Sequence, residues 1–213
     1  MTTLILVRHG ETEWNRAGRI QGHSDSTLTA EGLEQADAMG ARLRASLMTE
    51  AIDFVVSSDL LRAKRTAQLI ATHTDHCVVF DARLRERAFG IAEGKTYAEI
   101  DRDHPQMFSR TRETDPDYTA TDGESRNQFH QRIVGTLQSI TAEHAGKRIL
   151  VVSHGGVLAA VYRWLNKLPV SSPHKIDIPN VAYNRVNAAG SIWKIEVWGD
   201  TSHLDIATHN DRV

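Results

Sequence analysis

Leu4-Ile5-Leu6-Val7-Arg8-His9-Gly10 is the stretch of this sequence that decides the fold. A short continuous apolar run with β-branched members is typical of a buried strand in a parallel sheet. Arg8 and His9 follow at the carboxyl end of that strand. In open α/β sheets ligands bind at this edge, because the loops that leave the strand ends surround a crevice. We therefore expect Arg8 and His9 to belong to a ligand site.

A second stretch, late in the chain, repeats this pattern. Residues 149–152 form another apolar run, and Ser153-His154-Gly155-Gly156 follows it before an apolar helix expected over 157–165. The strand-end rule places His154 at the same edge of the sheet as His9. The two histidines are therefore predicted to face each other across one crevice.

The rest of the chain alternates short apolar runs with segments of helical spacing. We expect further strands at 54–56, 78–80, 182–186 and 192–198, and helices over 30–47, 60–71 and 126–140. This alternation is typical of an α/β protein with three αβα layers, in which a mostly parallel sheet has helices on both faces. We expect a single domain over residues 1–213, with a polar, lid-like excursion at about 101–123.

The expected helix starts carry residues that can act as N-caps. Thr29 is expected to cap the first long helix, and Ser125 with Gln128 has the spacing of a capping box. For the helix that begins near residue 60, Ser58 or Asp59 is expected to be the cap.

Composition limits the classes of partner. The chain has 213 residues and a formal net charge of −2, which argues against a general nucleic-acid-binding surface but permits a local basic site for a small anion. Cys77 is the only cysteine, so no intrachain disulfide is possible and a cytoplasmic location is expected. No apolar run approaches the roughly 20 residues that span a membrane. We expect a small-molecule partner, no contact with nucleic acid or membrane, and a monomer or homodimer.

Four interpretations of the two histidines compete. A metal site is disfavoured, because HExxH and paired CxxC motifs are absent and the charge of Arg8 would repel a dication. A nucleotide cradle at residues 90–96 has the wrong spacing for a Walker loop and lacks a preceding strand. A purely structural polar pair leaves the arginine beside His9 unexplained. A histidine nucleophile with charge-stabilising partners explains more, and it requires no metal and no cofactor.

Phosphoryl transfer is the chemistry that these residue types suit. A phosphoryl group carries negative charge on its equatorial oxygens, so a site that transfers it needs bidentate guanidinium donors. Arg8 offers one, and Arg62, in the first turns of the helix after the second strand, offers another at the same edge. Asn15 and the backbone near Gly155 are further candidate donors. The neutral imidazole of His9 is a competent nucleophile for phosphorus.

Four segments carry a resemblance to a known family. They are residues 6–12 (LVRHGET), residues 57–67 (SSDLLRAKRTA), Leu84-Arg85-Glu86 with Gly90 and Glu93-Gly94, and Ser153-His154-Gly155. In this order, over nearly the whole chain, they resemble the histidine phosphatase superfamily, the phosphoglycerate-mutase-like proteins. The resemblance implies the same three-layer αβα fold that is expected above.

The resemblance implies roles for individual residues. It implies that His9 is phosphorylated transiently and that the phosphate pocket is completed by Arg8, Arg62 and His154. It further implies that the substrate side is lined by Asn15, Gln21 and Gly22. Glu86 would be the proton donor, a role that a carboxyl group partly shielded beside Phe89 can perform. The residues alone leave open that Glu86 only pairs with Arg85 or Arg87.

The reaction within this family has more than one candidate. Cofactor-dependent mutases of the family are longer and carry an insertion with a paired arginine motif. No such pair occurs between Gly94 and Gly123, where Arg110 and Arg112 are the nearest basic residues. We therefore expect the short bacterial phosphatase branch, which hydrolyses a small phosphomonoester. The alternatives are a 2,3-bisphosphoglycerate-dependent phosphoglycerate mutase and a binding protein that keeps the fold without catalysis.

Overall fold

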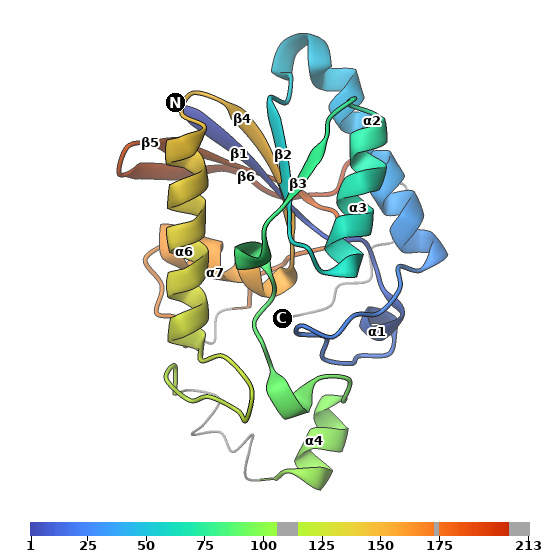
Figure 1. Ribbon diagram of the computed structural model, residues 1–213, viewed down its shortest axis with the longest axis vertical. Coiled ribbons are helices and arrows are strands. Elements are labelled where there is room, and N and C mark those ends of the chain that lie inside the picture. The colour runs from blue at the N-terminus through green and yellow to red at the C-terminus, as the bar shows by residue number, and fades with distance from the viewer. Residues whose placement is uncertain (106–114, 173–174, 205–213) are drawn as a thin grey trace.

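A six-stranded sheet runs through the middle of the molecule (Figure 1). The structure is a computed structural model, and it describes residues 1–105, 115–172 and 175–204. The strands lie in the order β3-β2-β4-β1-β5-β6. Their bounds are β1 Thr2–Arg8, β2 Phe54–Ser57, β3 Val78–Phe80, β4 Arg148–Ser153, β5 Tyr183–Ala189 and β6 Ile192–Asp200. The first four strands pair in parallel and the last two are antiparallel, so the sheet is mostly parallel, as predicted.

Helices cover both faces of this sheet, which confirms the three-layer α/β architecture (Figure 1). One face carries α2 Ala30–Glu50 and α3 Leu61–Thr72, and the other carries α6 Arg126–Glu143 and α7 Gly155–Leu165. Shorter elements occupy the connections: α1 Glu13–Arg16, α4 Tyr97–Asp103 and the 3₁₀ turns Ala82–Leu84 and Gly90–Ala92. Within the described ranges no helix has the length and apolar character needed to cross a membrane.

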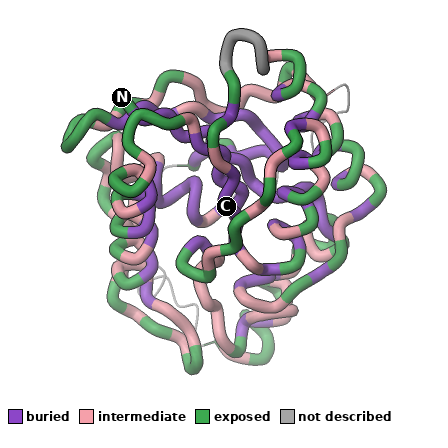
Figure 2. Tube along the Cα trace, turned by 45° about the horizontal axis from the view of Figure 1, so that its top comes forward, coloured by how far each residue is buried: buried purple, intermediate pink, exposed green. Residues whose placement is uncertain are grey.

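Alternation along β1 explains why both faces are covered. Leu4 and Leu6 pack into the core beneath α6 and α7, whereas Ile5 and Val7 pack into the core beneath α2 and α3. All four side chains are buried, and the inner strands form the buried centre of the molecule in Figure 2. Burying a side chain of this size stabilises the fold by about 1.5–3 kcal/mol. A strand that is apolar on both faces must lie inside such a sheet.

The register between β1 and β4 positions the two histidines. These neighbouring strands run in parallel with Arg8 opposite Ser153, so the residues that follow, His9 and His154, leave the sheet side by side. The His9 backbone N–H continues the ladder by donating to the Ser153 carbonyl oxygen at 2.9 Å. The prediction that both histidines lie at one sheet edge is confirmed.

Two of the three predicted helix caps are confirmed, and the third is wrong. The Thr29 hydroxyl accepts from the Gly32 N–H at 3.0 Å, and Ser125 with Gln128 forms the capping box of α6. At α3, however, the N-cap position is Leu60, which offers no side-chain acceptor. The carboxylate of Asp25, from a distant loop, accepts from the Leu61 N–H at 2.7 Å instead.

The polar excursion is only partly described. Residues 106–114 lie outside the described residues, and α4 occupies the start of the excursion. Ile100 forms a small separate apolar cluster with Ile20 and Ala92, against which Tyr118 packs. The described flanks of the excursion therefore rest on the loops near the sheet edge, and its function as a lid stays a prediction.

Gly10 provides a test of how closely the loop after β1 approaches α2. A Cβ atom at Gly10 would overlap the carbonyl oxygen of Gly32 in the first turn of α2. We expect Gly10→Ala to lower the free energy of unfolding by about 1–3 kcal/mol, because neither backbone can move without disturbing the sheet edge. Urea titration of the purified variant measures this change.

Gly135→Ala in α6 is the matched control, because nothing lies within 4 Å of the Cβ position there. This variant should be about 0.5–1 kcal/mol more stable than the wild type, since alanine favours the helix. A Gly10→Ala protein as stable as the wild type would contradict the close approach.

Candidate active site

His9 is almost completely buried at the end of β1, with 3% of its surface exposed. Its Nδ1 lies 2.8 Å from the carbonyl oxygen of Gly10. A carbonyl oxygen only accepts, so Nδ1 carries the hydrogen and Nε2 of the neutral ring keeps its lone pair. Burial, and then the charges of Arg62 and Arg8, hold the pKa of His9 well below its usual range. Near pH 7 the ring is therefore neutral, which is the nucleophilic form.

His154 lies next to His9, with the two ring centroids 5.4 Å apart. Its Nε2 lies 2.8 Å from Oγ of Ser58, and Ser58 Oγ also accepts from the Leu60 N–H at 3.3 Å. In the tautomer in which the Ser58 hydroxyl donates to Nε2, the ring hydrogen of His154 lies on Nδ1. That Nδ1 is buried without a hydrogen-bond partner among the described residues. Burial, followed by the charge of Arg62, lowers the pKa of His154 well below its usual value.

Arg62 is buried in the first turn of α3 and holds the preceding loop. Its Nη2 donates to the Gly22 carbonyl oxygen at 2.7 Å, and its Nη1 donates to the Ser24 carbonyl oxygen at 2.8 Å and to Asp25 at 2.9 Å. These bonds use three of the five guanidinium hydrogens. The remaining two lie on Nε, which is buried without a partner among the described residues, and on Nη2. They are the donors that Arg62 has left for an anion.

The loop over residues 18–26 is tied to the site by the Glu93 carboxylate. Glu93 accepts from the backbone N–H of His23 at 3.0 Å and of Ser24 at 2.8 Å. Gly22, which precedes these two residues, adopts a φ of 58°, and a Cβ atom there would overlap Glu93. Gln21 is 9% exposed, and its amide oxygen is buried without a partner in the described part of the chain. The structure thus places Gln21 and Gly22 beside Arg62.

Hydrogen bonds join Arg8 and His9 to the segment that precedes β5. Arg8 is 3% exposed, and its Nη1 donates to the carbonyl oxygen of Ile178 at 2.8 Å. The side-chain amide of Asn180 donates to the carbonyl oxygen of His9 at 2.8 Å. After burial and the charge of Arg62, the positive charge of Arg8 also lowers the pKa of His9 and of His154. The charges of Arg8 and Arg62 therefore act on both His9 and His154.

Glu86 reaches this group from the segment after β3. Its carboxylate accepts from the Gly156 N–H, in the first turn of α7, and from the Arg87 backbone N–H, each at 2.8 Å. A Cβ atom at Gly156 would overlap the carboxylate, so a larger residue there would displace Glu86 from this position. The alternative that Glu86 pairs with Arg85 is wrong, because Arg85 binds both carboxylate oxygens of Asp59 at 2.7 and 2.6 Å.

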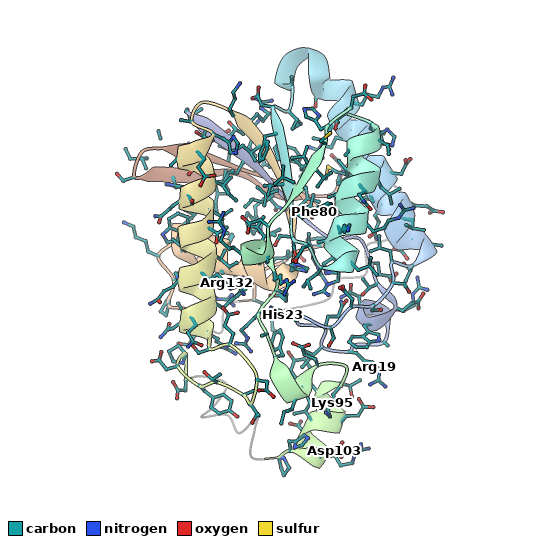
Figure 3. All side chains as sticks on the ribbon, in the orientation of Figure 1. Arg19, His23, Phe80, Lys95, Asp103 and Arg132 are labelled. Carbon is teal, nitrogen blue, oxygen red and sulfur yellow. The ribbon has the colours of Figure 1, made fainter. Side chains whose placement is uncertain are left out.

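Two side chains fix the backbone that carries Glu86. The carbonyl oxygen of Glu86 accepts from Nε2 of His23 at 2.9 Å and from Nη2 of Arg132 at 3.2 Å. Arg132 also donates to the carbonyl oxygen of Arg85 at 3.0 Å and binds the Glu124 carboxylate at 2.6 Å. Figure 3 labels Arg132 on α6 and His23 close to this extended segment. Glu86 is held from two elements that are distant in sequence.

Asn15 and Gly155 are the remaining predicted residues. Asn15 is half-buried in α1, where its Oδ1 accepts from the backbone and hydroxyl of Thr12 at 3.1 and 2.9 Å. That orientation leaves its Nδ2 hydrogens as donors. Gly155 is the buried first residue of α7. In the described residues, no three histidine, cysteine, aspartate or glutamate side chains are grouped so that they could hold a metal ion.

Sequence reasoning missed several residues that position the site. Asp25, His23, Arg132 and Asn180 act through contacts with residues far away in the chain. Nothing in their local sequence indicates these contacts. The position of Ser58 could have been predicted, because this residue follows the carboxyl end of β2, which borders β4. The strand-end rule could have placed it beside His154.

The buried neutral histidines predict a pH-dependent stability. In the unfolded chain both titrate near pH 6.5, whereas their folded-state pKa values are lower. Below about pH 6.5 the unfolded state binds more protons, so the free energy of unfolding should fall by up to about 1.4 kcal/mol per pH unit for each histidine. This loss continues until the folded-state pKa is reached.

His154→Gln and His9→Gln should each reduce that dependence by removing one titrating group. Urea titrations between about pH 5 and pH 7.5 measure the slope. Wild-type and variant slopes that coincide would show that these histidines are not buried in their neutral form.

Comparisons with known proteins agree with this geometry. The model of the histidine phosphatase superfamily (branch 1) matches residues 4–201. Probable phosphoglycerate mutase GpmB of Citrobacter koseri is 37% identical over 210 residues, which is 96% of each chain. The structure of YhfR from Bacillus stearothermophilus superimposes with a TM-score of 0.86 at 32% identity, over 95% of this chain and 99% of that one. A phosphoserine phosphatase mutant (H9A) from Entamoeba histolytica, in complex with phosphoserine, gives 0.82 at 28%, over 96% and 100%. The chain belongs to the histidine phosphatase superfamily.

Proposed function

We propose that this protein hydrolyses phosphomonoesters of small metabolites through a phosphohistidine at His9. The observation that supports this most strongly is the buried, neutral ring of His9, with a lone pair on Nε2, within the electrostatic field of Arg8 and Arg62. A neutral nucleophile that is surrounded by cations can approach an anionic phosphoryl group without repulsion.

Two chemical steps complete the reaction. In the first, the Nε2 lone pair of His9 forms the N–P bond while the bond from phosphorus to the alcohol oxygen breaks, and the carboxyl proton of Glu86 passes to that oxygen. In the second, a water oxygen forms a bond to phosphorus as the N–P bond breaks. Glu86 then takes the proton of the water, which restores the acid, and inorganic phosphate leaves.

The other residues stabilise charge on the phosphoryl oxygens during both steps. The two remaining donors of Arg62, on Nε and Nη2, suit two equatorial oxygens. The Nδ1 hydrogen of His154 and the amide of Asn15 are further donors. In this proposal, the side of the site that faces the substrate is lined by Gln21, Gly22 and the backbone at Gly155. Donors that are fixed before the reaction stabilise the transition state without having to reorganise.

The protein's own residues supply every group in this proposal, so no metal and no cofactor takes part. The proposal includes a cytoplasmic location and a monomer or homodimer acting on a small molecule. A phosphoglycerate mutase is the second candidate, and it is favoured by the name of the relative from C. koseri. The phosphoserine phosphatase of similar structure favours hydrolysis.

His9→Ala tests the nucleophile. This variant should lose turnover of p-nitrophenyl phosphate by a factor on the order of 10³ or more, because the covalent step has no other donor of an electron pair. His73→Ala is the matched control, since this side chain lies at the opposite end of α3 from Arg62. Activity of the wild type should be insensitive to EDTA. Persistent turnover by His9→Ala would refute the mechanism, and so would loss of wild-type turnover in EDTA.

Acid-quenched phosphoenzyme and product analysis separate hydrolysis from transfer. After mixing with 3-phosphoglycerate, a phosphatase releases inorganic phosphate and its phosphohistidine decays in water. A mutase forms 2-phosphoglycerate, keeps its phosphohistidine, and is stimulated by 2,3-bisphosphoglycerate. We expect phosphate release and isomerisation below the background rate. Isomerisation faster than phosphate release would establish the mutase.

A further inference from the structure

Three arginine side chains whose charges act on one another have no role in the chemistry above. Arg87 follows Glu86 in the chain, Arg126 is the first residue of α6, and Arg163 lies in the last turn of α7. The helices α6 and α7 pack against each other. We call Arg87, Arg126 and Arg163 the arginine cluster.

The arginine cluster lacks carboxylates at ion-pair distance among the described residues. Within residues 1–105, 115–172 and 175–204, none of the three guanidinium groups forms an ion pair. By contrast, the neighbouring Arg85 and Arg132 bind carboxylates at 2.6 Å. The Nε atoms of Arg87 and Arg163 are buried and have no hydrogen-bond partner in the described residues. Buried N–H groups are normally satisfied, so these donors are available to an acceptor that a ligand brings.

The positive charges of the cluster act on one another. Burial, and then the charge of Arg126, lower the pKa of both Arg87 and Arg163. Burial and the charge of Arg163 lower the pKa of His130, which lies one turn after Arg126 on the same face of α6. Like charges that are partly buried repel one another, and an anion placed among them would remove that repulsion.

Arg126 is also unfavourable for its own helix. As the first helical residue of α6 it lies at the positive end of the helix dipole, where acidic residues are favoured. The first turn of α6 contains no acidic residue. Local stability therefore does not explain an arginine at this position, whereas binding of an anion would.

Glu86 connects the arginine cluster to the phosphoryl site. Its carboxylate interacts with Arg62 on the phosphoryl side and with Arg87 in the cluster. Arg163 follows Gly156, whose N–H binds Glu86, by two helical turns on the same face of α7. The alcohol that leaves phosphorus takes its proton from Glu86 in the proposed reaction. The rest of that alcohol would then extend from Glu86 toward Arg87, the member of the cluster that follows Glu86 in the chain.

We propose that the arginine cluster binds a second anionic group on the alcohol part of the substrate. The preferred substrates are then phosphomonoesters that carry a carboxylate or another phosphate. This inference rests on the proposed phosphatase function, and it adds the substrate class and two specificity residues, Arg126 and Arg163. Guanidinium groups bind either anion through paired hydrogen bonds.

Matched substrate pairs test the preference. We would compare kcat/KM for 3-phosphoglycerate with glycerol 1-phosphate, and for fructose 1,6-bisphosphate with fructose 6-phosphate. Each pair differs by one anionic group, a carboxylate in the first and a phosphate in the second. We expect the wild type to prefer the charged member of at least one pair roughly 10- to 100-fold, and the pair that responds identifies the anion.

Arg126→Glu connects that preference to the cluster. This variant should reduce the ratio of kcat/KM within the responding pair to near one. Its melting temperature should rise, because glutamate suits the start of α6 and pairs with the other two arginines. Arg163→Gln should reduce the same ratio. Arg44→Ala, which removes an exposed arginine of α2, is the control that keeps the wild-type ratio.

The outcomes separate this inference from the proposed function. Turnover of p-nitrophenyl phosphate that depends on His9, with no preference in either pair, would overturn the arginine cluster as an anion site and leave the phosphatase standing. A preference that survives in both Arg126→Glu and Arg163→Gln would overturn it as well. Absence of any His9-dependent turnover would instead refute the proposed function.

Discussion

The parallel pairing of β1 with β4 is the constraint on which the rest of the site depends. Because Arg8 lies opposite Ser153, the chain leaves both strands at the same level and places His9 and His154 with their rings 5.4 Å apart. A shift of one residue would turn every side chain of β1 to the other face of the sheet. The core beneath α6 and α7 would then receive Ile5 and Val7 in place of Leu4 and Leu6, and the core beneath α2 and α3 would receive the reverse, so both would have to repack. The packing that stabilises the sheet therefore also fixes the register of the histidines.

Burial and charge act together on these histidines. Each is enclosed by the loops at the sheet edge, and each lies in the field of Arg62. Both effects disfavour the imidazolium form, so the same environment that would bind a phosphoryl group keeps the nucleophile neutral. Arg62 can supply this field at low exposure because three of its hydrogens are satisfied by the loop that ends at Asp25. The oxygen atoms of the loop thus take the place of the water molecules that would solvate an exposed arginine.

The fold and the central residues of the site could be predicted from sequence because they depend on local rules. Continuous apolar runs identified β1 and β4, and the strand-end rule placed His9 and His154 together. The support for Glu86 could not be predicted in this way. Arg132 lies on α6 and His23 in a loop before α2, and both meet the Glu86 carbonyl oxygen through long-range folding. Side chains that bind backbone at a distance leave no pattern in a single sequence.

The failed cap prediction at α3 follows from the site itself. Ser58 and Asp59 are the residues that local rules favour as caps. Ser58 instead binds His154 at 2.8 Å, and Asp59 binds Arg85 in the segment that carries Glu86. With both of these side chains directed to the site, the free N–H of Leu61 is satisfied by Asp25, which also pairs with Arg62 at 2.9 Å. One carboxylate therefore joins the loop, the start of the helix and the buried arginine. Because the cap of α3 comes from a distant residue, Arg62 keeps its position only while the loop that carries Asp25 is ordered.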